Sequence, residues 1–243
     1  MLFSDENVAA YINENFEPAW QSVRPVPTVT IDFGNGKIVK RTLHGNVATY
    51  VCNDDGTVLD VLPGIYQPRT YLDRLGQLQL LYRYVQQETA LIADPAGALH
   101  EYHASAAAAL SKNEPYKIAE VEFDRPSIVR IEKSVKIVLN PADRIQARLQ
   151  AAKGIRTEPT SIAAPKSSAE LPHWRALATD TEINETQRRL LIHQHLLETG
   201  KTTPDELKKW LYKEVLHADL DDPYLGLGSI LFDAYPFSDE DQQ

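Results

Sequence analysis

The sequence predicts a mixed α/β (α+β) fold that ends in a helical C-terminal module. Two pairs of β-branched runs are each joined by a glycine-containing turn, which is typical of antiparallel hairpins. Several longer segments repeat apolar residues at three- and four-residue steps, the period of an amphipathic helix. Residues 154–172 contain prolines and serines but few apolar residues, so they are expected to form a linker before the last helices.

The first expected elements are a short helix and a hairpin. Ser4 is placed to cap a helix whose apolar positions, from Val8 to Phe16, form a single stripe. The runs 28–33 and 37–43 flank a Gly-Asn-Gly turn and are rich in β-branched residues. We therefore expect these two runs to pair as antiparallel strands.

A second hairpin and two helices follow. Residues 47–52 and 57–62 are joined by an Asn-Asp-Asp-Gly turn, whose glycine accepts a positive φ without strain. Pro68 is expected to begin a helix, because proline is favoured in the first helical turn. This helix is expected to run to about residue 93. An alanine-rich helix is expected over 96–110.

The second half of the chain predicts strands, the linker and further helices. The runs 116–123 and 128–139 have strand character, and 143–153 has helical character. One later helix is expected to end at Gly200 and the next to begin at Pro204. The elements predict four regions, namely a first domain over residues 1–112, a strand ribbon and helix over 113–153, the linker over 154–172 and a helical module over 173–243.

The first domain carries a family resemblance. The run Val47–Gly64, with the helix after Pro68, resembles the second half of a thioredoxin-like domain, in which a strand, an Asp-Gly turn, an edge strand and a glycine lead into the final helix. Residues Phe3–Phe16 resemble the end of that family's first long helix. The resemblance covers about the first third of the chain. It implies a thioredoxin-like mixed sheet with flanking helices.

Two features of that family are missing from the sequence. The family's CxxC redox pair would precede Phe3, whereas Cys52 is the single cysteine here, and Ala48 stands where the family has a cis-proline. The resemblance therefore implies a redox-inactive binding or scaffold protein rather than an enzyme. The alternative is a thiol-disulfide oxidoreductase whose CxxC lies upstream of Met1.

The resemblance also implies a site and a partner. Asn46, Ala48 and Thr49 occupy the positions that face the CxxC in the family, so they are expected to line a groove for a protein or peptide. The family's first strand would also precede Phe3, and a sheet without this strand would have unpaired edges. We expect either the ribbon at 116–139 or a second copy of the chain, in a homo-oligomer, to complete that sheet.

Composition limits the other function classes. The formal net charge of −9 disfavours binding to nucleic acid or to anionic membranes, because both need an excess of basic residues. There is no signal-peptide pattern at the N-terminus and no apolar run of the ~18 residues that a membrane span needs. These observations predict a soluble, cytoplasmic protein, and no cofactor is expected.

The candidate reactive residues each have an ordinary structural explanation. Cys52 lies on a strand with no basic residue near it in sequence, so we expect a buried, inert thiol rather than a reactive one. His100 and His103, spaced three apart, are weak candidates for metal ligands, since two ligands do not make a site. A metal-dependent activity through the histidines therefore ranks below the other two hypotheses.

Charged residues of the later helices suggest solvent-facing surfaces. Glu185, Arg188, Arg189 and Glu198 are expected on the solvated side of a helix. The acidic run 219–222 lacks the spacing of a calcium loop, and neither a phosphate-binding glycine motif nor a catalytic triad can be recognised from residue spacing.

Overall fold

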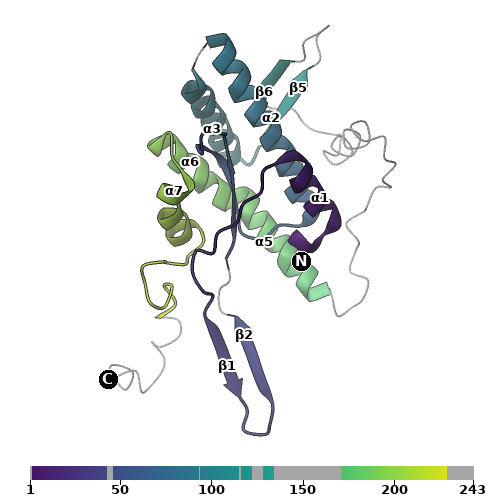
Figure 1. The fold of residues 1–243 in the computed structure, drawn as a ribbon, viewed down its shortest axis with the longest axis vertical. Coiled ribbons are helices and arrows are strands. Elements are labelled where there is room, and N and C mark those ends of the chain that lie inside the picture. Colours follow the sequence, from purple (N-terminus) through teal and green to yellow (C-terminus); the bar gives the residue numbers. More distant parts are fainter. Residues whose placement is uncertain are drawn as a thin grey trace. The chain divides into compact units, whose positions relative to one another are not determined.

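The computed structural model describes residues 2–42, 46–92, 94–114, 116–121, 128–133 and 171–228 (Figure 1). These residues combine helices with small antiparallel sheets, so the predicted α+β class is confirmed. The helix expected at 143–153 and residues 154–170 of the expected linker lie outside the described residues.

The strands form hairpins. In chain order they are β1 (Thr28–Asp32), β2 (Ile38–Thr42), β3 (Ala48–Cys52), β4 (Val58–Pro63), β5 (Tyr116–Val121) and β6 (Ile128–Lys133). Each odd-numbered strand pairs antiparallel with the strand that follows it. Both predicted hairpins are therefore confirmed, as is the strand character of the later ribbon over the residues that the structure describes, 116–121 and 128–133.

The ribbon does not complete a larger sheet. Among the described residues every sheet has two strands, and β5 and β6 pair only with each other. They pack instead against helix α2 (Pro68–Ile92). The expectation that this ribbon extends the β3–β4 sheet is therefore wrong for the described residues, because the ribbon packs on α2 and not beside β3 or β4.

The N-terminal helices follow the predicted boundaries closely. α1 (Glu6–Asn15) follows a short 3₁₀ turn, η1 (Leu2–Ser4), and α3 (Pro95–Ser111) follows α2. The cap of α1 is Asp5 rather than Ser4, since Asp5 Oδ1 accepts hydrogen bonds from the amides of Asn7 and Val8. Ser4 is used in the 3₁₀ turn, so the next residue takes the capping position.

The C-terminal helices contain two π-helical segments. α5 (Leu171–Ile183), η2 (Asn184–Arg188) and α6 (Arg189–Thr199) follow one another directly, and α6 ends at Gly200 as predicted. α7 (Pro204–Trp210) continues into η3 (Leu211–Val215). π-Helical turns are rare and occur often at functional sites, so η2 is a candidate position for a functional residue.

The chain divides into two compact units. The first comprises Met1–Pro18 and Ala48–Pro204, and the second comprises Ala19–Val47 and Asp205–Gln243. These units differ from the four ranges expected from the sequence, because α6 packs beside α3 and against β4 within the first unit (Figure 1).

The core of the first unit lies around β4. All six residues of β4 are buried, and the Val58 amide also donates to the carbonyl of Thr202 at 2.9 Å. Apolar side chains from α1, β3, α2 and α3 pack with the strand, including Tyr11, Val51, Tyr71, Leu78, Leu81 and Tyr102. Within the described residues, no helix has both the length and the apolar character needed to cross a membrane.

Candidate functional site

Asp60 is a charged residue at the centre of the buried strand β4. Its side chain has no solvent exposure. Oδ2 accepts a 2.6 Å hydrogen bond from the Tyr102 hydroxyl and a 2.8 Å bond from Arg189 Nη2, while Oδ1 accepts from the Val61 amide. Burial alone would raise the pKa of Asp60, but the charge of Arg189 outweighs it and holds the pKa below its usual range. The carboxylate is therefore ionised and fully hydrogen-bonded.

Arg189 connects this carboxylate to a pair of histidines. Its side chain is 4% exposed, and Nη2 lies 3.3 Å from Nε2 of His193. His103 and His193 are both buried, with their Nδ1 atoms 2.9 Å apart. The cluster thus joins β4, α3 and α6 through polar contacts inside the core.

The hydrogen-bond partners assign the histidine tautomers. A guanidinium only donates, so His193 Nε2 must accept and His193 carries its proton on Nδ1. That Nδ1–H donates to His103 Nδ1, which leaves the proton of His103 on Nε2. This Nε2 is buried and has no hydrogen-bond partner among the described residues.

Both histidines are held neutral. Burial lowers the pKa of His103 to about 4 and lowers the pKa of His193 well below its ordinary value. Near neutral pH the pair therefore carries no charge beside Arg189. The buried cation is balanced by Asp60 rather than repelled by its neighbours.

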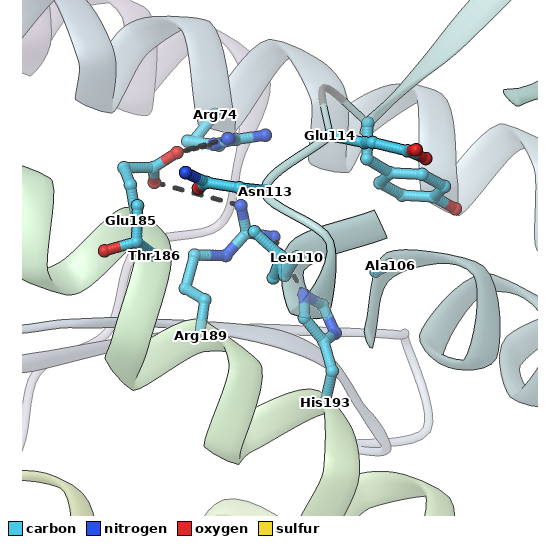
Figure 2. Close-up of a pocket in the computed structure, with 10 residues that line it drawn as sticks. Arg74, Ala106, Leu110, Asn113, Glu114, Glu185, Thr186, Arg189 and His193 are labelled. Carbon is cyan, nitrogen blue, oxygen red and sulfur yellow. Dashed lines mark hydrogen bonds and ion pairs between the residues drawn. The ribbon is translucent and has the colours of Figure 1, made fainter. Parts of the chain in front are cut away.

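A pocket of about 320 Å³ opens beside this cluster (Figure 2). Its size is at the lower end of the range of small-molecule sites. Its lining comes from α2, α3, the turn into β5, η2 and α6. The lining residues are Arg74, Ala106, Leu110, Asn113, Glu114, Tyr116, Glu185, Thr186, Arg189 and His193.

Glu185 is a carboxylate of the pocket wall that lies between two arginines. Its Oε2 accepts from both Nε and Nη2 of Arg74, with the Nε bond at 2.6 Å. Its Oε1 is buried and accepts no hydrogen bond from the described residues, while Arg189 Nη1 lies 3.8 Å away (Figure 2). Burial would raise the pKa of Glu185, but Arg74 and Arg189 together hold it below its usual value.

Asn184 anchors the π-helical segment that carries Glu185 through hydrogen bonds of its side chain. Asn184 has no solvent exposure; its Nδ2 donates to the Ile65 carbonyl at 2.9 Å, and its Oδ1 accepts from Arg188. Gly64 approaches so closely that a Cβ there would lie 3.0 Å from the Asn184 amide. The loop after β4 therefore holds η2, and with it Glu185, in position.

The groove residues expected from the family resemblance lie elsewhere. The hydroxyls of Thr49 and Tyr71 lie 2.9 Å apart, and Ala48 pairs with Pro63 in the β3–β4 ladder. Asn46 belongs to the second unit, where Nδ2 donates to the Leu216 carbonyl. None of the three lines the pocket.

Cys52 lies at the end of β3, away from the pocket lining. The side chain is half-buried rather than buried. Burial, and secondly the negative charge of Asp55, raises the pKa of the thiol. The thiol is therefore protonated near neutral pH, which agrees with the expected low reactivity.

The expected pair of metal-ligand candidates separates on α3. His100 is exposed, whereas His103 is buried against His193. Across the part of the chain that the structure describes, no group of three or more His, Cys, Asp or Glu residues is arranged to hold a metal ion. Sequence spacing identified His103 but not its partner, which lies 90 residues later.

The prediction that Glu185 and Arg189 lie on a solvent-exposed helix face is wrong. Arg189 is buried, and Glu185 lies in the pocket wall with a side chain only 16% exposed, although Glu198 is exposed as expected. Their partners, Asp60 and Arg74, lie more than 100 residues earlier. The available signal was Asp60 itself, a carboxylate within the apolar run Val58–Leu62.

Two carboxylates of the acidic run in the second unit form ion pairs with lysines. Lys213 contacts Asp219 at 2.8 Å and Lys209 contacts Asp221 at 2.9 Å. The carboxylate of Asp222 accepts from the amides of Tyr224 and Gly226. This agrees with the interpretation of the segment as an acidic turn rather than a calcium loop.

Comparison of the chain with protein-family models, with curated proteins and with solved structures found no match.

Proposed function

We propose that this chain is a non-catalytic binding protein of the thioredoxin-like type, and that its ligand site is the pocket beside Glu185 and Arg189. The observation that carries the proposal is the buried, unpaired oxygen of Glu185, which faces an arginine across a gap too wide for a hydrogen bond. Buried polar atoms are normally satisfied, so a polar group bound in the pocket beside these two atoms would complete their hydrogen bonding.

The order of elements supports the family assignment. β3, the Asp-Gly turn, β4, Gly64 and α2 follow one another as in the family's second half, and Gly64 adopts φ +76° at the point where the strand leaves the hairpin. Both strands and the helix contribute to one core. Among the described residues β3 and β4 form a two-stranded sheet, so the order of elements, and not a larger mixed sheet, is what supports the proposal.

The protonation states support binding rather than chemistry. Both ring nitrogens of His193 are directed at other cluster residues, so neither is free to exchange a proton with a ligand. Burial, and secondly the charge of Asp60, raises the pKa of Tyr102 well above its usual value. The Cys52 thiol lies outside the pocket. His193, Tyr102 and Cys52 are therefore not placed or ionised for general acid-base or thiol chemistry on a ligand in the pocket.

The fixed position of the pocket wall supports a binding role. Arg189 is fixed by its hydrogen bond to Asp60, and Glu185 is fixed by its hydrogen bond from Arg74. A wall that is ordered before the ligand arrives loses little conformational entropy on binding. A pocket of this size accepts a small molecule, so we propose such a ligand in place of the protein or peptide partner expected from the sequence.

The experiment is a ligand-observed NMR screen with a chemically mixed fragment library. Leu110 lines the pocket and the adjacent Ser111 is exposed outside it, so Leu110→Trp fills the pocket and Ser111→Trp is the matched control. We expect fragments that bind the wild type and the Ser111 variant but not the Leu110 variant. The proposal is wrong if no fragment separates the two variants while circular dichroism shows both to be folded.

A further inference from the structure

Glu185 Oε1 and Arg189 form an unsatisfied acceptor and donor side by side. The 3.8 Å between Oε1 and Nη1 is an ion-pair separation, not a hydrogen bond. Arg189 Nε is likewise buried without a partner among the described residues. A group that can both donate and accept satisfies the two sides together.

The hydrogen-bonding chemistry of the gap selects between ligand classes. A hydroxyl donates one hydrogen bond and accepts others, so one hydroxyl or two neighbouring hydroxyls can bridge Glu185 and Arg189. An ammonium group only donates and a carboxylate or phosphate oxygen only accepts, so each would satisfy one residue and oppose the other.

The charges at the pocket disfavour an anionic ligand. Arg74 and Arg189 are cationic, Glu114 and Glu185 are anionic and His193 is neutral, while Asp60 behind the wall already pairs with Arg189, so the site has no excess of positive charge. Burying an anion there is unfavourable because no excess of positive charge compensates for its loss of water, and an ammonium group would leave Arg189 without a further acceptor.

The remaining lining suits a small molecule with polar edges and an apolar face. Asn113 and Glu114 are exposed and lie where the chain leaves α3, with Asn113 at φ +59°. Leu110 and Tyr116 supply apolar surface on the same pocket. Hydroxyl groups therefore meet amide and carboxylate partners, while carbon-bound hydrogens meet the apolar side chains.

We infer that the ligand is a neutral polyol of about monosaccharide size, bound through neighbouring hydroxyls between Glu185 and Arg189. The inference rests on the proposed function, because it names the ligand class of the same pocket. It predicts weak binding by simple sugars and sugar alcohols, and no preference for ions.

The test is a titration of isotopically labelled protein with five probes, followed by protein NMR. D-glucose and myo-inositol are the polyols, and inorganic phosphate, putrescine and acetamide represent an anion, a cation and an amide. We expect saturable shifts of the Asn113, Glu114 and Thr186 amides with a polyol, at lower concentration than with the other three probes.

Variants at the edge of the pocket give the internal control. Asn113→Gly keeps the positive φ and removes the side-chain amide, and Glu114→Gln removes the charge with little change in shape. Each should weaken polyol binding roughly three- to tenfold, the effect of one hydrogen bond. Lys112→Ala, at the adjacent exposed position outside the lining, should leave it unchanged.

Two results would overturn the inference. Tighter binding of phosphate, putrescine or acetamide would show a different ligand class, and the absence of saturable shifts with both polyols would show that the pocket does not take them. If fragments still separate Leu110→Trp from Ser111→Trp, either result leaves the proposed binding function standing.

Discussion

Asp60 of β4 and Arg189 of α6 form a 2.8 Å ion pair in which neither side chain is more than 4% exposed. The two residues are 129 positions apart, so the pair joins the β3–β4 hairpin to the last helix of the first unit. A buried pair of this kind is not by itself strongly stabilising, but the loss of one partner leaves a buried charge uncompensated.

Asp60→Asn should therefore be strongly destabilising. Asparagine keeps the size of the side chain but removes the charge that balances Arg189, and the expected loss in the free energy of unfolding is about 3–5 kcal/mol. Urea unfolding followed by circular dichroism would measure it. An unchanged unfolding midpoint would contradict the importance of the pair.

Two further variants separate the charge effect from a general effect of mutating the hairpin. Asp55→Asn removes a carboxylate of the same hairpin that contacts Lys201 on the exposed surface, and it should change stability little. Asp60→Leu combined with Arg189→Met removes both charges. This double variant should be more stable than Asp60→Asn, since neither member of the pair is left as a buried charge without its partner.

Stability should decrease on acidification before most carboxylates titrate. The pKa of His103 is about 4 in the folded protein and near 6.5 in the unfolded chain, so the unfolded state binds more protons between these values. The stabilisation is complete above about pH 6.5 and is lost as the pH falls toward 4, by up to ~3 kcal/mol. Urea unfolding at a series of pH values would measure it.

The histidine variants identify the source of this pH dependence. His103→Gln should reduce the slope of stability against pH between 6.5 and 4, whereas His100→Gln, on the exposed side of α3, should leave the slope unchanged. His193 shifts in the same direction, so a smaller slope is expected to persist in the His103 variant. Equal slopes in all three proteins would exclude His103 as a contributor.

Gly64→Ala should destabilise more than Gly56→Ala. Both glycines have positive φ, near +76° and +81°, so alanine is strained at each, by ~1–2 kcal/mol. A Cβ at position 56 meets nothing within 4 Å, whereas one at position 64 lies 3.0 Å from Asn184. The difference between the two unfolding midpoints measures the cost of the close contact between the β4 loop and η2. Equal midpoints would show that η2 can move away from the added Cβ without a loss of stability.

Cys52 should react slowly in the folded protein. Since burial raises the pKa of this half-buried thiol, alkylation by iodoacetamide at pH 7.5 should be slower than that of free glutathione and should become fast in urea. The wild type and Cys52→Ser should reduce insulin disulfides no faster than dithiothreitol alone. A Cys52-dependent acceleration would favour the oxidoreductase hypothesis over the binding function.

Much of the local structure could be predicted because its signals are short-range. The Asp-Gly turn between β3 and β4, Pro68 at the start of α2 and Gly200 at the end of α6 each act through the conformation of a few neighbouring residues. Alternation and helical periodicity placed the strands and helices between them. The capping residue of α1 was missed by one position, since two adjacent residues are both good caps.

The site could not be predicted in the same way, because each of its contacts joins distant parts of the chain. Arg189 and Glu185 look like surface residues of an amphipathic helix until Asp60 and Arg74 are brought against them. By itself the sequence determined the elements and the presence of one cysteine. The tertiary structure alone decided which charges are buried and paired, because burial and pairing depend on packing between segments that local propensity does not describe.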